Sequence, residues 1–272
     1  MSKSLFSRSK PLIAGLALLA GVAAPAQGGP NKFKVTNVHF ETNSSACDMG
    51  IQLAFDTEGL TQGSVTNPNG NLIYSFKSGD GMKATGGQTE GFLEGIEPQI
   101  KELMDALGCA RSKEEGLSTL SELFASFPQG QYTFSGIHKG LPIEHQDRLT
   151  YHIPAGPKVV APSKGAILPP QHVTIRWKAV TGPILPYLGP VTITGYHVIV
   201  EENTGTEVAP ELDADVAATT TSLKVPARFL KPATQYLFEV LSSETSGNQT
   251  ITEGFFCTDG VNSCRQPLRQ RK

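Results

Sequence analysis

The chain has 272 residues, with 28 glycines, 19 prolines and a formal net charge of −2. This mildly acidic balance gives no electrostatic footprint for nucleic acid, whose phosphates select basic proteins. Helical periodicity is confined to one region, and the many turn-forming residues point to β-sandwiches rather than to helical folds. The fold class that we expect is therefore mainly β, with two β-sandwich domains.

Residues 1–26 have the three parts of a secretory signal. Three cations precede the apolar run Leu12–Ala24, and Ala24-Pro25-Ala26 fits the small-residue cleavage rule. The apolar run is too short to span a bilayer comfortably. We therefore expect a secreted or periplasmic protein with no transmembrane segment after signal cleavage; an uncleaved N-terminal anchor is the alternative.

The length that remains suits two domains of ordinary size. A proline-rich stretch predicts an extended linker between them, and the C-terminus is basic. The tail is interpreted as a solvated terminus, or alternatively as a weak contact with an anionic cell surface. The expected segments are a first sandwich at 27–152 with a helical insertion at about 97–127, a linker at 153–162, a second sandwich at 157–260, and the tail at 261–272.

Alternating apolar residues predict the strands of the first domain, because a period of two gives one buried and one solvated face. Asn67-Pro68-Asn69-Gly70 predicts a tight turn between two of them. A glycine-rich loop is expected at Ser78–Thr89. The expected strands are Lys32–Phe40, Gly50–Phe55, Ser64–Thr66, Asn71–Phe76, Gln131–Gly136 and Arg148–Ile153.

Two short helices are expected in the insertion. Pro98 suits the first turn of the earlier helix, and Gly108 suits its end. The later helix begins either at Ser112, with a capping box, or at Ser118, and Pro128 ends it.

Four motifs follow one another at sandwich spacing in the second half of the chain. They are VTIRWKAV (Val173–Val180), TITGYHVIVEE (Thr192–Glu202), LKPATQYLFEVLS (Leu230–Ser242) and QTITEGFFCT (Gln249–Thr258). In this order they resemble the fibronectin type III family over about residues 157–260. The resemblance implies a core role for Trp177 and a tyrosine corner in which the Tyr236 hydroxyl bonds back to the preceding backbone. It implies an immunoglobulin-like sandwich, an architecture that we expect of both domains, and it implies no catalytic residues.

The four cysteines are even in number in a chain that is expected to be exported, so two disulfides are the default. Three connectivities are possible. Membership of the two domains favours Cys47 with Cys109, and Cys257 with Cys264.

Three acids in TEGFLEGIEP, Glu90, Glu94 and Glu97, are weak candidates for calcium ligands, with Asp48 and Asp80 as possible neighbours. Carboxylates in a glycine-rich loop suit calcium, but the spacing matches no EF-hand. Acids that precede a helix also complement its dipole, and we prefer that interpretation. We therefore expect no metal and no cofactor.

No nucleophile elbow and no phosphate-binding glycine loop occurs, and the histidines show no metal-ligand spacing. The sequence thus indicates a non-catalytic binding or adhesion protein, not an enzyme, with an unidentified protein or cell-surface component as partner. The alternative is a carbohydrate-binding or accessory module beside a secreted hydrolase.

A contact surface for the partner is expected in the loop Thr181–Val191, which lies at the same end of such a sandwich as Ser243–Asn248. Three prolines stiffen the longer loop and lower the cost of ordering it. Between them stand the apolar candidates for partner binding, Ile184, Leu185, Tyr187 and Leu188. The alternative is that these side chains cover the open end of the core or pack against the first domain.

Overall fold

The computed structural model describes residues 33–112, 115–204 and 209–265. The expected signal segment and residues 266–272 of the expected tail lie outside them. The described chain is mainly β, as the sequence predicts, with strands β1–β17 in three sheets and three short α-helices. Within the described ranges, no helix is long and apolar enough to cross a bilayer.

The N-terminal half contains nine strands and all three α-helices of the described chain. In chain order they are β1 Phe33–Asn43, β2 Asp48–Leu60, β3 Gln62–Thr66, β4 Leu72–Lys77, α1 Asp80–Ala84, β5 Gln88–Glu94, β6 Gln99–Ile100, α2 Lys101–Leu107, β7 Leu117–Ser118, α3 Leu120–Ser126, β8 Gly130–His138 and β9 Leu141–Leu149.

The C-terminal half contains the other eight strands and one 3-10 turn. They are β10 Lys158–Ala161, β11 Ala166–Leu168, η1 Pro170–His172, β12 Thr174–Lys178, β13 Ile193–Glu202, β14 Glu211–Ala217, β15 Ser222–Lys224, β16 Gln235–Glu244 and β17 Gln249–Thr258.

The first core lies between the sheet β4-β3-β8-β9 and the strands β1, β2 and β5. Alternating side chains of β1 and β2, such as Phe40 and Leu53, meet Phe134 of β8 in this core. The turn predicted at Asn67–Gly70 joins β3 to β4, and Gly70 has the positive φ of 79° that the turn requires. The first half is therefore a sandwich, as expected.

Several boundaries differ from those predicted in this half. Strand β5 falls on residues that we expected to be loop and helix start. Strand β9 ends at Leu149, so the strand expected at Arg148–Ile153 is wrong. β9 is mostly polar outside Ile143 and Leu149, and its alternation is therefore weak in the sequence.

The helices also start later than predicted. Helix α2 begins at Lys101 rather than at Pro98, although Gly108 caps its end with a φ of 75°. Helix α3 begins after Thr119, whose side chain accepts from the Glu122 amide in a capping box, so neither predicted start is right. A five-residue helix, α1, also stands in the loop predicted at Ser78–Thr89.

The second core lies between the sheet β10-β12-β15 and the strands β13, β14, β16 and β17. Trp177 of β12 is 3% exposed and packs edge-to-face on Tyr196, with ring centroids 5.3 Å apart. The Tyr236 hydroxyl accepts a 2.8 Å hydrogen bond from the Lys231 amide. The expected tyrosine corner and the core position of the tryptophan are confirmed.

Both expected disulfides are present. Cys47–Cys109 ties the turn between β1 and β2 to the segment after α2, and Cys257–Cys264 closes a short loop after β17. In the loop-entropy model the longer link contributes about 4 kcal/mol to the free energy of unfolding.

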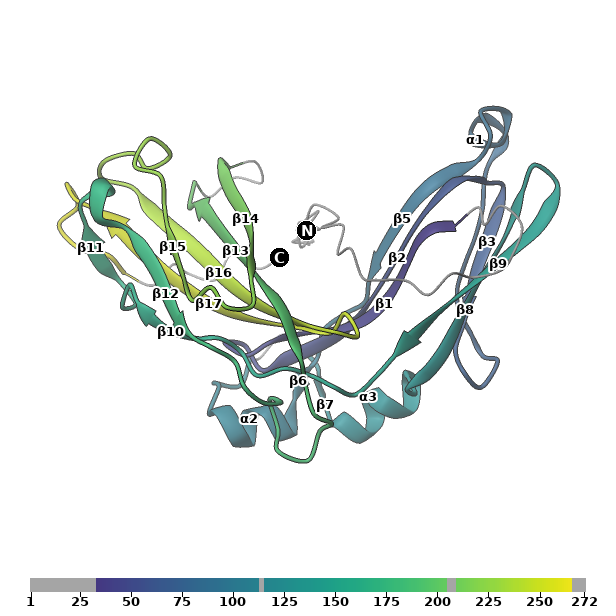
Figure 1. The fold of residues 1–272 in the computed structure, drawn as a ribbon, viewed down its shortest axis with the longest axis horizontal. Coiled ribbons are helices and arrows are strands. Elements are labelled where there is room, and N and C mark those ends of the chain that lie inside the picture. Colours follow the sequence, from purple (N-terminus) through teal and green to yellow (C-terminus); the bar gives the residue numbers. More distant parts are fainter. Residues whose placement is uncertain (1–32, 113–114, 205–208, 266–272) are drawn as a thin grey trace, which may run out of the picture.

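The two sandwiches share one sheet. β1 pairs in parallel with β17 over Glu41–Asn43 and Gln249–Ile251, which joins them in the order β14-β13-β16-β17-β1-β2. Figure 1 shows two arms that diverge as a V, with α2 and α3 near the apex and the shared sheet passing through the bend. The arms are therefore joined by backbone hydrogen bonds and not by a linker alone.

Asn248 fixes this junction with its side chain. Its Oδ1 accepts a 2.8 Å hydrogen bond from the Phe40 amide, and its Nδ2 donates to the carbonyl oxygens of Thr150 and His152 at 2.9 and 3.1 Å. The residue is 0% exposed. Nearby, a side chain at Gly156 would collide with Ser44, because a Cβ there would lie 2.2 Å from the serine hydroxyl oxygen.

We expect Trp177→Ala to lower the free energy of unfolding by about 3–5 kcal/mol, since it opens a large cavity in the second core. Chemical denaturation followed by circular dichroism measures the change. Lys178→Ala, at the exposed neighbouring position, serves as the control and should stay within about 0.5 kcal/mol of the native protein. An unchanged midpoint for the tryptophan variant would contradict the packing described here.

We expect Asn248→Ala to cost about 2–4 kcal/mol, because it leaves one buried amide and two buried carbonyl groups without their partner. Thermal melting compares it with Asn262→Ala, which alters an exposed asparagine. Equal melting temperatures for the two variants would show that Asn248 does not hold the junction.

Candidate functional site

The loop in which we predicted the partner surface lies against the first sandwich. Leu185 and Leu188 are 4% and 9% exposed and belong to the first core, and Ile184 packs against that core. The Ile184 amide also donates to the Ile153 carbonyl oxygen at 3.0 Å. Tyr187 alone among the four candidates is largely exposed, at 66%. This arrangement corresponds to the alternative in which the loop packs against the first domain.

The second loop of that end, Ser243–Asn248, is also held at the junction, through Asn248 and through a hydrogen bond between the Ser246 and Thr150 hydroxyls. Both loops thus join the two sandwiches. We therefore looked for a contact surface on the sheets.

The shared sheet has one face that turns away from both cores, and we call it the shared face. Its positions follow from the strand register, because residues directly opposite one another point to the same side. In the second sandwich one row of this face runs across four strands through Asp213, Ile199, Glu239 and Glu253, each opposite the next. In the first sandwich a row runs across three strands: His39 lies opposite Gln52, and Gln52 lies opposite Glu94.

The shared face is acidic. Acids occupy it on seven strands of the sheet, and those at its two ends are exposed. The acids of this face are Glu41, Asp48, Asp56, Glu90, Glu94, Glu201, Glu211, Asp213, Asp215, Glu239 and Glu253. Lys34, which pairs with Asp56 at 3.4 Å, is the only lysine or arginine in the described strands of the shared sheet. The sheet itself therefore supplies almost no neutralising charge.

Three of the carboxylates meet at the middle of the face. Oxygen atoms of Glu41 on β1, Glu94 on β5 and Glu97 just after β5 lie within 4.8 Å of one another. Two amides contact them: Gln249 donates to Glu41, and Gln52 donates to Glu94 at 3.2 Å. We call these three acids the glutamate cluster.

The surroundings of the glutamate cluster shift the pKa values of two buried side chains, Glu41 and His39. Burial, together with the charges of Glu239 and Glu94, raises the pKa of Glu41 to about 8, and the Gln249 and Gln52 amides oppose the rise only in part. Burial lowers the pKa of His39, two residues earlier on β1, to about 4, so its imidazole is neutral at physiological pH. At a pKa of about 8, Glu41 keeps its proton at neutral pH, and protonation relieves the repulsion from Glu239 and Glu94.

Of the weak calcium candidates predicted from the sequence, Glu94 and Glu97 are brought together, and Glu41 is the neighbour that sequence reasoning missed. Glu90 lies on the same face but pairs across to Asp56, and Asp48 lies opposite Asn43. Asp80 opens α1 and is not a member of the cluster. Alternation in β1 would have placed Glu41 on the solvent side, but its approach to Glu94 depends on β2, which pairs with β1 on one side and with β5 on the other.

The outer three-stranded sheet has the opposite charge. Its exposed face carries four cations, and no acid occurs in its strands; the cations are Lys158, Arg176, Lys178 and Lys224. The second sandwich is therefore acidic on one side and basic on the other.

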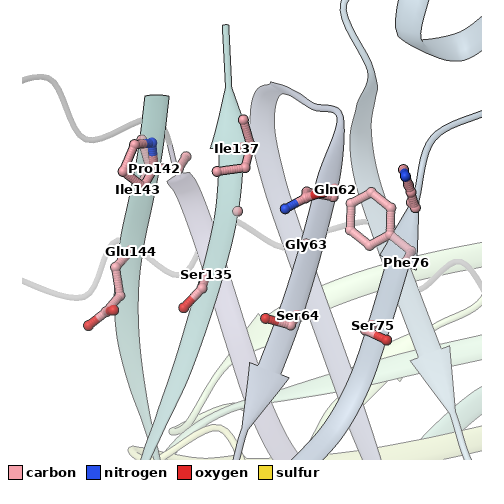
Figure 2. A pocket seen from close by; sticks show the side chains of 12 residues that line it. Gln62, Gly63, Ser64, Ser75, Phe76, Ser135, Ile137, Pro142, Ile143 and Glu144 are labelled. Atoms are coloured by element: carbon pink, nitrogen blue, oxygen red, sulfur yellow. The ribbon is translucent and has the colours of Figure 1, made fainter. Parts of the chain in front are cut away.

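A shallow, open groove crosses the four-stranded sheet on the first sandwich (Figure 2). Ser75, Ser64, Ser135 and Glu144 form a row across its four strands. Figure 2 shows these side chains side by side, with Phe76 beside Gly63. The row offers uncharged hydroxyls but no convergent set of charged or aromatic groups, so it is a weaker candidate than the shared face.

No family model and no curated protein matches this chain. Among solved structures it is similar to the FN1–FN3 domains of chicken CNTN1, at 12% identity and a TM-score of 0.29, over 84% of this chain and 69% of that one. It is also similar to the tetra-tandem repeat in the extending region of a large adhesion protein, at 13% identity and a TM-score of 0.29, over 83% of this chain and 50% of the other. Similarities this low carry no argument about fold or function.

We expect Leu188→Ala to destabilise the protein by about 2–4 kcal/mol, because Leu188 fills part of the first core. Tyr187→Ala, one residue away and exposed, should stay within about 0.5 kcal/mol. Thermal melts of the two single variants test this split. A Leu188→Ala protein that melts at the native temperature would show that Leu188 does not contribute to the first core.

Proposed function

We propose that the protein is a non-catalytic, exported binding protein that holds a lysine- or arginine-rich segment of a partner protein against the shared face. The observation that carries the proposal is the charge of this face, which presents acids on seven strands, while the described strands of the shared sheet contain a single lysine and no arginine. Complementary charge steers such a partner and sets its orientation.

The architecture supports this role. A face built on paired strands is rigid, so little conformational entropy is lost on association. Both arms contribute to one surface, since the sheet continues through β1 and β17. Two disulfides fit an oxidising, extracytoplasmic compartment. The second sandwich, with its tyrosine corner, is proposed to be a fibronectin type III domain.

The test uses the mature protein and a fluorescent decalysine peptide as probe, with EDTA present throughout. The variant Glu90→Gln with Asp215→Asn removes one exposed acid from each arm of the shared face. The control, Asp105→Asn with Glu144→Gln, removes the same charge from exposed positions away from that face. We expect the first variant to bind about threefold to tenfold more weakly than the control, since an exposed charge pair contributes about 0.2–1 kcal/mol.

Fluorescence anisotropy at low and high salt measures the affinities. Equal weakening in the two double variants would show that only net charge matters and would refute the proposal. Self-association at low salt that Lys178→Gln abolishes would also count against it, because the basic outer sheet of a second copy would then be the occupant.

A further inference from the structure

The outer sheet of the second sandwich carries a separate charged surface, which we call the basic face. It is the exposed side of β10, β12 and β15, and its four exposed cations are Lys158, Arg176, Lys178 and Lys224. Within residues 33–112, 115–204 and 209–265, none of the four forms an ion pair or a side-chain hydrogen bond. The described chain therefore leaves these charges open to water or to a partner.

The strand register places two of the like charges directly opposite one another. Lys158 lies opposite Lys178 across β10 and β12, and Arg176 occupies the next row. Like charges in directly opposed positions destabilise a sheet. The sequence has no Asp or Glu at 153–200 or at 216–238, which include all three strands and the loops beside them. These segments thus hold no acid of their own that could neutralise the cations.

A hollow beside the opposed lysines leaves room for an anionic group. It is open to solvent, has a volume of about 360 Å³, and is bordered by Lys158 and Lys178 together with small residues such as Gly156, Ala179 and Gly182. Because glycines form part of its wall, a phosphate group can enter the hollow and approach both ammonium groups.

The composition of the basic face suits an anionic lipid surface better than a single bound chain. Its cations are spread over three strands, and three of them are lysines, which act as point charges without the bidentate geometry of arginine. Val160, at 52% exposure, adds an apolar side chain to β10. Trp177 is the one aromatic residue in these strands, and its ring lies in the core, so they offer no ring for stacking on a sugar.

The opposite side of the same sandwich gives this contact a direction. The acidic shared face and the basic face lie on opposite sides of the second core. In Figure 1, β10 and β12 lie on the outer side of their arm, and the shared sheet faces the space between the arms. An anionic plane attracts the first side and repels the second, and both effects fall off over a Debye length of about 10 Å at 0.1 M salt.

We propose that the basic face docks the protein on an anionic lipid surface, with the acidic shared face turned away from the lipid. The inference goes beyond the partner proposed above and does not rest on it. The two can fail separately, because the vesicle assay contains no peptide and the peptide assay contains no lipid.

The test is co-sedimentation of the mature protein with vesicles of phosphatidylglycerol and phosphatidylcholine in equal parts. Vesicles of phosphatidylcholine alone are the neutral comparison. We expect binding to the anionic vesicles at low salt, and we expect high salt to release the protein, because salt screens exposed charges. Inability of the anionic vesicles to bind more protein than the neutral ones would overturn the inference.

Lys158→Gln with Lys178→Gln should weaken binding to the anionic vesicles about thirtyfold, which is about fivefold for each cation near the surface. The matched control, Lys77→Gln with Lys83→Gln, removes the same charge from exposed positions of the first sandwich and should bind as the native protein does. The first variant should melt no lower than the native protein, since it relieves the repulsion between opposed lysines. Equal losses of binding in the two variants would show that only net charge or the basic tail matters, and would refute the proposal.

Acetylation of lysines, measured by mass spectrometry, tests the orientation on the vesicles. Lys158, Lys178 and Lys224 should become protected when anionic vesicles are added, while Lys34, which pairs with Asp56 of the shared face, should stay reactive. Protection of Lys34 in their place would contradict the orientation. Protection of Lys158 and Lys178 without vesicles would identify a second copy of the chain as the occupant and would also overturn the inference.

Discussion

The buried amide of Asn248 is the contact on which the rest of the arrangement depends. Where β17 begins, it satisfies one backbone amide of β1 and two carbonyl groups of the segment after β9. With these groups paired, β17 can run beside β1 in parallel, although the two strands lie about 200 residues apart in sequence. Unpaired, the same groups would each cost about 1–3 kcal/mol, so the amide makes the junction specific.

The junction between the two sandwiches determines which surfaces remain open to a partner. Loops at the end of a sandwich are commonly its binding elements, because they vary without disturbing the core. Here Leu185 and Leu188 from one loop complete the first core, and Asn248 from the other locks the sheet. Both loops therefore hold the two arms together and are largely covered. A continuous sheet face, contributed by both arms, takes their place as the candidate surface.

The sequence predicted the features that depend on residues close together in the chain. Alternation at Tyr236, Phe238 and Val240 predicted the strand, and the resemblance of its motif implied the tyrosine corner. The domain membership of the cysteines predicted their pairing. Strand β5 was missed because it is an edge strand: Leu93 is the one large side chain that it packs against the core, while Phe92 and the glutamates point outward.

Two of the three acids in the glutamate cluster could be predicted from the sequence, and the third could not. Glu94 and Glu97 are neighbours in the chain, but Glu41 joins them only because β2 pairs with β1 on one side and with β5 on the other. The role of Asn248 was likewise hidden, since a polar residue in a turn is ordinarily solvated. Both depend on contacts between distant strands, which no short-range pattern encodes.

A simpler explanation for acids on a sheet is protection of its edges from pairing with other chains. That explanation suits Glu211, Asp213 and Asp215, which stand on the edge strand β14. It does not suit Glu41 on β1 or Glu239 on β16, because each of these residues is paired with a neighbouring strand on both sides. Interior positions half-buried beside one another are also where a like charge is most costly, since water screens it least. Threonine or glutamine at Glu41, Glu239 and Glu253 would suit the sheet without that cost. Edge protection therefore does not account for Glu41 and Glu239 at the centre of the shared face.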